Sequence, residues 1–300
     1  MLPAPAKMDV STHLDDPMRP KTPPPPDAVE HFDLVLEPGR NREWRELWRY
    51  RDLLYFFARR DALVRYKQTA IGVAWVVLRP LVTMAIFTFV FGRLAGFPSG
   101  GVPYPVFVFA ALLPWQLFAT GLQASSDSLV NNAQLVSKIY FPRIVAPISA
   151  VAAALIDFAV SLAMLIAIAL LYGQPLSWRI LTIPVPLAIV LAAALGLGLW
   201  FATLSARYRD FQHIVPFVIQ VGLYASPIGY DALLVPERWR AWYALNPLVG
   251  VTDAFRWAFV GQGRPLDGAA LATAAAVSLA LLASGAAYFR RGERAVADVI

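Results

Sequence analysis

Few side chains in this 300-residue chain are of the kinds that perform covalent or metal chemistry. The absence of cysteine excludes a disulfide framework, a thiolate metal site and a cysteine nucleophile. The three histidines (His13, His31 and His213) are scattered, so we expect no metal centre. A phosphate-cradling loop needs glycines followed by a lysine at the start of a helix, and none of the four lysines follows such a loop. We therefore expect that the chain is not an enzyme and that any energy from ATP comes from another subunit.

One carboxylate, Asp157, lies far from either end of a long apolar stretch. A charge at the centre of a membrane costs about 2.5 to 3.5 kcal/mol on insertion scales, so this side chain must face protein or water. It is either a cavity-lining group that contacts a cation or a sugar hydroxyl, or a structural group that is protonated or hydrogen-bonded near Ser161. The sequence leaves both interpretations open.

The composition is that of an integral membrane protein. Hydrophobic residues make up 58% of the chain and charged residues only 15%, whereas soluble domains carry about 25% charged residues. Six apolar stretches are each long enough to cross a hydrocarbon core about 30 Å thick. We therefore predict an all-α fold with six transmembrane helices, at about 71–91, 105–129, 144–172, 180–204, 214–230 and 268–289.

The basic residues predict the orientation. Of the 26 lysines and arginines, 19 lie in the N-terminal segment, the loops at 130–143 and 205–213, and the C-terminal tail. Six arginines (Arg93, Arg179, Arg238, Arg240, Arg256 and Arg264) fall on the opposite side, and Arg79 lies within the first span. The positive-inside rule then places both termini in the cytoplasm.

The membrane domain, residues 41–291, is flanked by two cytoplasmic tails. Residues 1–40 hold nine of the 24 prolines and no apolar period, which predicts a flexible Pro-rich tail, and 292–300 form a short C-terminal tail. Residues 44–67 predict a helix with a tryptophan- and leucine-rich stripe and flanking arginines, lying in the membrane interface and packing partly on protein. The alternative is an ordinary surface helix on a soluble core.

Two connections between spans differ from simple loops. The cytoplasmic segment 131–143 is polar and contains Pro142, which prevents one continuous helix. It is either a short helix that docks into a cytoplasmic partner or a plain connection. Residues 231–267 are rich in tryptophan but broken by proline and glycine, which predicts two short helices that dip into the outer leaflet and return. The alternative is an amphipathic loop held by a tryptophan belt.

Several motifs, in order, resemble the permease subunits of ABC transporters that export polysaccharides, a branch of the type-two ABC exporters. The resemblance covers about residues 44–291. Its motifs are Arg65-Tyr66-Lys67 with Gly72, Trp75 and Pro80; Leu113-Pro114-Trp115; Asn131 to Pro142; Arg207-Tyr208-Arg209-Asp210; Ser226-Pro227-Ile228 with Tyr230; and Leu245-Asn246-Pro247-Leu248. Ala111 replaces an expected glycine, and the Pro-rich extension lies outside the family pattern.

The resemblance implies a homodimer in the bacterial inner membrane that exports a lipid-linked, O-antigen-like polysaccharide. Two copies of a separate ATPase, which binds ATP and magnesium, would drive it, and the permease itself would hold no cofactor. Contact with the ATPase would involve Asn131, Leu135, Val136, Lys138, Phe141 and Pro142. Arginine and lysine suit phosphate, so the lipid diphosphate would meet Arg65, Lys67 or Arg79, although the positive-inside rule also explains these residues.

The outer aromatic residues have two interpretations. They are either belt and packing residues or groups on which sugar rings stack as they pass. The candidates for the channel or gate are Trp115, Phe118, Asp157, Tyr224, Trp239, Trp242 and Tyr243.

Other functions fit the sequence less well. Export of teichoic acid, lipid or a drug by the same kind of permease is the nearest alternative. An intramembrane glycosyl- or phosphotransferase would need paired carboxylates or a metal-binding acidic motif, and the acidic residues here are mostly isolated. A proton-coupled transporter would usually show several ionisable groups within the spans and internal repeats.

Overall fold

The computed structural model describes residues 51–67, 72–133, 141–260 and 265–297, and every regular element in these ranges is a helix. Five helical segments are long and apolar enough to cross a membrane: Ala74–Leu94, Tyr104–Asn131, Val145–Leu171, Trp178–Arg207 and Gly268–Gly292. They confirm five of the six predicted spans to within a few residues. Two of the segments are composite. Helix α3 (Gly72–Phe87) continues into a π-helix, η2 (Thr88–Leu94), and a short 3-10 helix, η3 (Trp178–Thr182), precedes α7 (Pro184–Arg207).

The fifth predicted span, 214–230, is shorter than expected as a helix. Helix α8 covers Phe211–Tyr224, only 14 residues, and residues 225–230 form bends. At 1.5 Å per residue, α8 is about 21 Å long, less than the thickness of a hydrocarbon core. The first part of this predicted span is therefore helical, but residues 225–230 are not.

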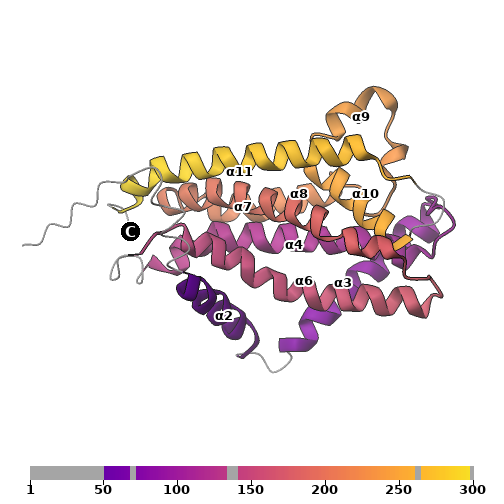
Figure 1. The fold of residues 1–300 in the computed structure, drawn as a ribbon, viewed down its shortest axis with the longest axis horizontal. Helices are drawn as coiled ribbons and strands as arrows, with labels where there is room; N and C mark the ends of the chain where they lie inside the picture. Colours follow the sequence, from indigo (N-terminus) through magenta and orange to yellow (C-terminus); the bar gives the residue numbers. More distant parts are fainter. Residues whose placement is uncertain (1–50, 68–71, 134–140, 261–264, 298–300) are drawn as a thin grey trace, which may run out of the picture. The chain divides into compact units, whose positions relative to one another are not determined.

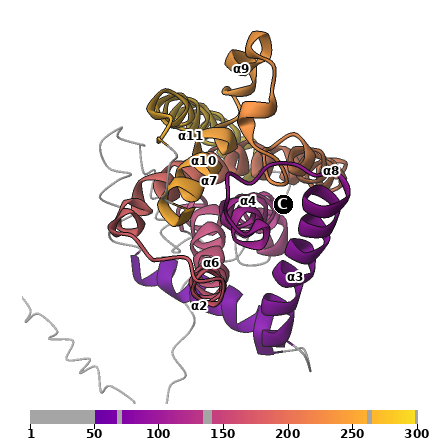
Figure 2. The same cartoon turned by 90° about the vertical axis from the view of Figure 1, so that its right-hand side faces the viewer.

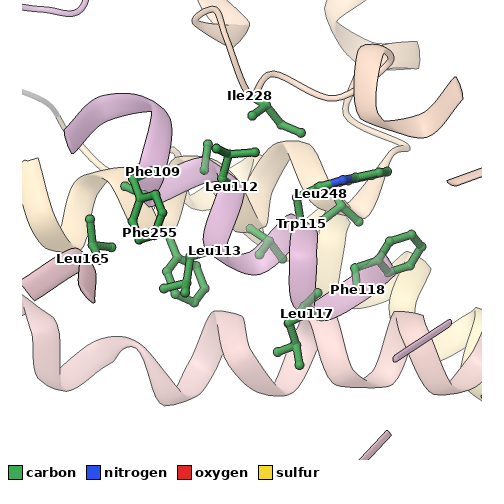
Figure 3. Packing of buried hydrophobic residues seen from close by; sticks show 14 of the residues in the cluster. Phe109, Leu112, Leu113, Trp115, Leu117, Phe118, Leu165, Ile228, Leu248 and Phe255 are labelled. Atoms are coloured by element: carbon green, nitrogen blue, oxygen red, sulfur yellow. The ribbon is translucent and has the colours of Figure 1, made fainter. Parts of the chain in front are cut away.

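Helix α4 (Tyr104–Asn131) forms the centre of the bundle. Figure 2 views the bundle from one end and shows α4 surrounded by α6 (Val145–Leu171), α7 and α10 (Pro247–Val260). Of its most apolar 18-residue window, 78% is buried. Figure 3 shows Leu112, Leu113 and Leu117 of α4 in one cluster of buried residues that also includes Leu165, Ile228 and Phe255 from other segments. The first part of α4, from Tyr104 to Trp115, is apolar on all sides, as expected for a helix at such a central position.

Helices α7 and α11 (Gly268–Ala297) run side by side along the bundle (Figure 1) and approach closely through glycines. A Cβ atom on Gly285 would lie 2.2 Å from the carbonyl oxygen of Gly196, and one on Gly196 would lie 2.5 Å from the backbone nitrogen of Leu282. Small residues that allow two backbones to approach are typical of helix pairs in membranes.

The first span packs much less than the others. Only 6% of the window in Ala74–Leu94 is buried, and its exposed side chains include Trp75, Val82, Ile86 and Phe89. In Figure 2, α3 lies to one side of the α4-centred bundle. The rest of the described chain therefore leaves most of the surface of this span uncovered.

The remaining helices connect or cover the spans. The described part of the predicted interface helix is α2 (Arg51–Lys67), and Leu53, Leu54 and Phe57 pack on Phe141 and Val145, which confirms that this helix packs partly on protein. Residues 44–50 lie outside the described ranges.

The region 231–267 contains the expected two helices after a short 3-10 turn, η4 (Ala232–Leu234). Helix α9 (Glu237–Tyr243) projects from the bundle in Figure 1, whereas α10 is buried within it.

Candidate functional site

A groove of about 1780 Å³ runs between α4 and the loosely packed α3, with further walls from α2, α6 and α8. We call the end of the bundle that carries Asn131 the Asn131 end, and the end at which α4 begins the Tyr104 end. The polar residues lining the groove are Arg60, Asp61, Arg79, Thr83, Gln116, Thr120, Gln123, Asp127, Ser128, Asn131, Asn132, Asp157, Ser161 and Gln220. So many polar groups inside an apolar bundle indicate a water-accessible path.

Helix α4 contributes a regular row of polar side chains to this groove. Gln116, Thr120, Gln123, Asp127 and Asn131 follow one another at intervals of three or four residues, which places them on one helical face. The Gln123 side-chain amide donates a hydrogen bond to the Asp127 carboxylate at 2.7 Å. The row offers amide, hydroxyl and carboxylate groups along most of the helix, and such groups can exchange hydrogen bonds with sugar hydroxyls.

The structure places two of the seven predicted channel or gate residues on the groove wall. Asp157 and Trp115 line it, Asp157 from α6 together with Ser161 one turn further on. Phe118 is buried beside Trp115, with their ring centroids 5.7 Å apart, and is not part of the lining. Tyr224, Trp239 and Trp242 are exposed outside the groove.

At the Asn131 end, α2 is tied to α4 by a polar contact. The Arg60 guanidinium donates to the Asn132 side-chain oxygen at 2.5 Å and to the Asp61 carboxylate at 2.7 Å, and it lies over the Phe57 ring. Both Arg60 and Asp61 line the groove. This link joins α2 directly to the end of the polar row.

The described residues of the predicted coupling segment lie against the same helix. Phe141 is buried and meets Phe57 edge to face, with ring centroids 5.6 Å apart, while the Pro142 carbonyl accepts a hydrogen bond from the Val145 amide at the start of α6. Asn131 is exposed at the end of α4. Leu135, Val136 and Lys138 lie outside the described residues.

Of the three residues predicted to meet a lipid diphosphate, only Arg79 is described with its side chain. It is exposed on α3 and lines the groove. Arg65 and Lys67 belong to α2, but their side chains are outside the described part of the structure.

At the Tyr104 end, three consecutive carbonyl groups of the bent segment are bound by side chains from other helices. Arg256 donates to the carbonyls of Ile228, at 2.8 Å, and Tyr230, at 3.0 Å, while the Tyr104 hydroxyl donates to the carbonyl of Gly229. Arg256 also donates to the Phe107 carbonyl at 3.3 Å. Non-helical backbone at membrane depth requires such partners, since lipid provides none.

The same arrangement brings together two motifs that are separate in sequence. The Asn246 side-chain amide donates to the Ser226 hydroxyl at 3.0 Å, and its oxygen accepts from the Leu248 amide. The hydroxyls of Tyr230 and Tyr243 are 3.0 Å apart. Burial raises the pKa of Tyr243 well above its usual value, and the contact with Tyr230 adds to this effect, so the phenol is neutral.

Two buried charged residues of α10 were not expected from the sequence. Arg256 was counted only among the six arginines on the opposite side of the membrane, and its side chain is 1% exposed. Asp253 is 7% exposed. A charged residue inside the apolar run 247–260 was the available signal.

Residues 52–260 match the ABC-2 type transporter family, and the chain belongs to this family of membrane transport subunits. The O-antigen export system permease protein RfbA of Myxococcus xanthus is 30% identical over 259 residues, which cover 85% of this chain and 98% of that protein. A Klebsiella pneumoniae protein of the same name is 31% identical over 70% of this chain and 80% of its own length. The polysialic acid transport protein KpsM of Escherichia coli is 25% identical over 79% and 92%. The resemblance drawn from the motifs is confirmed.

Proposed function

We propose that this chain is the channel subunit of an ABC transporter that exports a lipid-linked, O-antigen-like polysaccharide across the bacterial inner membrane. The observation that carries the proposal is the row of polar side chains from Gln116 to Asn131, which faces a groove inside an otherwise apolar helix bundle. The names of the relatives, two O-antigen export permeases and a polysialic acid transport protein, support this class of cargo.

The chain crosses the membrane six times, with the Asn131 end and both termini in the cytoplasm. The distribution of lysine and arginine supports this orientation. The fifth crossing consists of α8 and the bent segment 225–230, because α8 alone is too short. The hydrogen bonds from Arg256 and Tyr104 make a non-helical segment tolerable at that depth.

Two copies of the chain form the channel. The span Ala74–Leu94 has little contact with its own chain, and it borders the groove. A second copy packed against the groove side would cover the part of α3 that lines the groove, between Trp75 and Thr83, and convert two open grooves into one enclosed path. The polar rows on the two α4 helices would then face a common lumen.

Two copies of a separate ATPase, which bind ATP and magnesium, drive transport from the cytoplasmic side; the permease itself holds no cofactor. Their movement reaches the channel through the segment from Asn131 to Pro142, including Leu135, Val136 and Lys138, and through α2. The Phe57–Phe141 contact and the Arg60–Asn132 hydrogen bond support this route, since they join both elements to the spans. ATP can shift the channel only if its two states differ in their contacts with the ATPase.

The lipid diphosphate is recruited on the cytoplasmic side by Arg65, Lys67 or Arg79. Arg79 has the most support, because its side chain lines the groove. The glycan then follows the α4 row past Asp157 and Trp115 toward the Tyr104 end. There the 225–230 segment, α9 and α10 form the outer gate, with Phe118, Tyr224, Trp239, Trp242 and Tyr243 in or beside it.

The test is to delete the gene, examine the surface polysaccharide, and purify the chain with the ABC ATPase encoded nearest to it. We expect the glycan to accumulate inside the cell and the complex in lipid nanodiscs to have the mass of two permeases and two ATPases. Normal export in the deletion strain, or a permease that purifies alone whatever ATPase is supplied, would contradict the proposal.

A further inference from the structure

A second, smaller cavity of about 320 Å³ lies at the Tyr104 end, where the first span, the start of α4 and the end of α6 meet. It shares no lining residue with the groove. Its lining residues are Met84, Ala85, Thr88, Phe89, Arg93, Pro105 and Tyr172. Four of these side chains are apolar, and three carry a hydroxyl or a guanidinium group.

The three polar groups have no partner among the described residues. The Thr88 hydroxyl oxygen is buried without a hydrogen bond. The exposed side chains of Arg93 and Tyr172 form no hydrogen bond or ion pair with any part of the chain that the structure describes. Because the Thr88 oxygen is itself covered, the donors that a ligand in the cavity can reach are the Arg93 guanidinium and the Tyr172 hydroxyl.

The backbone that carries Thr88 and Arg93 is firmly placed. Both residues belong to the π-helix η2, a rare element often found at functional sites. Gly92 lies against the Tyr104 ring so closely that a Cβ atom would be 2.8 Å from its Cγ, and Phe91 stacks on Phe97 with ring centroids 5.9 Å apart. The wall of the cavity is therefore anchored to α4 and not to lipid alone.

We propose that this cavity binds one membrane glycerophospholipid, with its phosphate held by Arg93 and Tyr172. Guanidinium and hydroxyl donors are suited to phosphate, and an arginine at the end of a span lies at headgroup depth. Met84, Ala85 and Phe89 offer an apolar surface to the first acyl carbons. The bound lipid would supply contacts that the protein does not give this span, which is only 6% buried. The inference goes beyond the proposed function, because it requires only that the chain be embedded in a membrane.

The test measures lipid retained by the purified full-length chain, using native mass spectrometry after exchange into phosphatidylglycerol or phosphate-free diacylglycerol. We expect wild-type chain to retain phosphatidylglycerol, and Arg93→Gln to bind it about tenfold more weakly, because a charge-assisted contact is lost. Arg93→Lys should retain it, and so should the matched control Arg238→Gln, which removes an exposed arginine from α9 outside the cavity.

Tyr172→Phe provides a second test that leaves the charge unchanged, and it should weaken retention severalfold. Equal retention by wild type, Arg93→Gln and Tyr172→Phe would overturn the proposal, as would equal binding of diacylglycerol. Displacement of the lipid by inorganic phosphate alone would assign the site to a free anion. A photo-crosslinker at position 89 that captures a second copy of the chain instead of lipid would assign it to a protein interface. None of these measurements requires export or an ATPase.

Discussion

The guanidinium carbon of Arg256 lies 3.7 Å from the centre of the Phe107 ring, between α10 and the central helix α4. The ring faces the cation while backbone carbonyls from two segments accept its hydrogen bonds. Arginine is suited to this position because its flat group can stack on a ring and donate in several directions at once. A buried positive charge is thereby stabilised.

Replacement of Arg256 by methionine should destabilise the protein. Each carbonyl left without a donor costs about 1 to 3 kcal/mol, so we expect the thermal midpoint in detergent to fall by on the order of 5 °C or more. Arg256→Lys should recover only part of the loss, because one ammonium group cannot donate to all of these carbonyls with the geometry of the planar guanidinium. Arg238→Met removes an exposed arginine and serves as the control. Equal midpoints for Arg256→Met and Arg238→Met would refute the structural role.

A methyl group at Gly285 should force α7 and α11 apart. Its Cβ would overlap the carbonyl oxygen of Gly196, and overpacking of this kind costs about 1 to 3 kcal/mol. We expect Gly285→Ala to lower the thermal midpoint clearly. Gly268→Ala, on the same helix with no atom within 4 Å of the new Cβ, should not. The close approach would be disproved by a Gly285→Ala midpoint that matches the Gly268→Ala one.

Filling the groove should reduce export. Thr120→Phe places a bulky ring in the middle of the polar row, so we expect severalfold less polysaccharide on the cell surface at equal permease abundance. Ala159→Phe introduces the same ring at an exposed position of α6 outside the lining and should leave export unchanged. Immunoblots of the surface glycan measure the effect. Equal export by both variants would mean that the cargo does not pass this part of the groove.

Arg60→Ala should weaken coupling between ATP hydrolysis and transport. The substitution removes the hydrogen bond to Asn132, which links α2 to the end of α4, together with the ion pair to Asp61 within α2. We expect severalfold less export per ATP hydrolysed by the reconstituted complex, with assembly retained. Arg59→Ala, at the neighbouring exposed position, is the control. Unchanged coupling in Arg60→Ala would show that the movement of the ATPase reaches the spans through other contacts.

The sequence was sufficient to predict the long spans, because hydropathy and length alone decide which segments can cross a membrane. It also indicated that α2 packs partly on protein, which Leu53 and Phe57 confirm. It could not predict the burial of Arg256, whose partners Phe107, Ile228 and Tyr230 are 26 to 149 residues away in sequence.

The groove was equally beyond prediction. Gln116 and Gln123 read as ordinary polar residues in an apolar helix, and only the position of α3 shows that they face open space. Helix packing in membranes depends on local shape and polar contacts, which hydropathy does not measure. Asp157 was identified from its depth, and its role stays a prediction.

The three bound carbonyls of residues 228–230 have a mechanical consequence. Because side chains of α4 and α10 hydrogen-bond to successive peptide groups, we expect this stretch to move together with those two helices. Helix α10 in turn packs on α4, α7 and α11. Any widening at the Tyr104 end is therefore a displacement shared by several long helices, and its stiffness is set by the bundle as a whole.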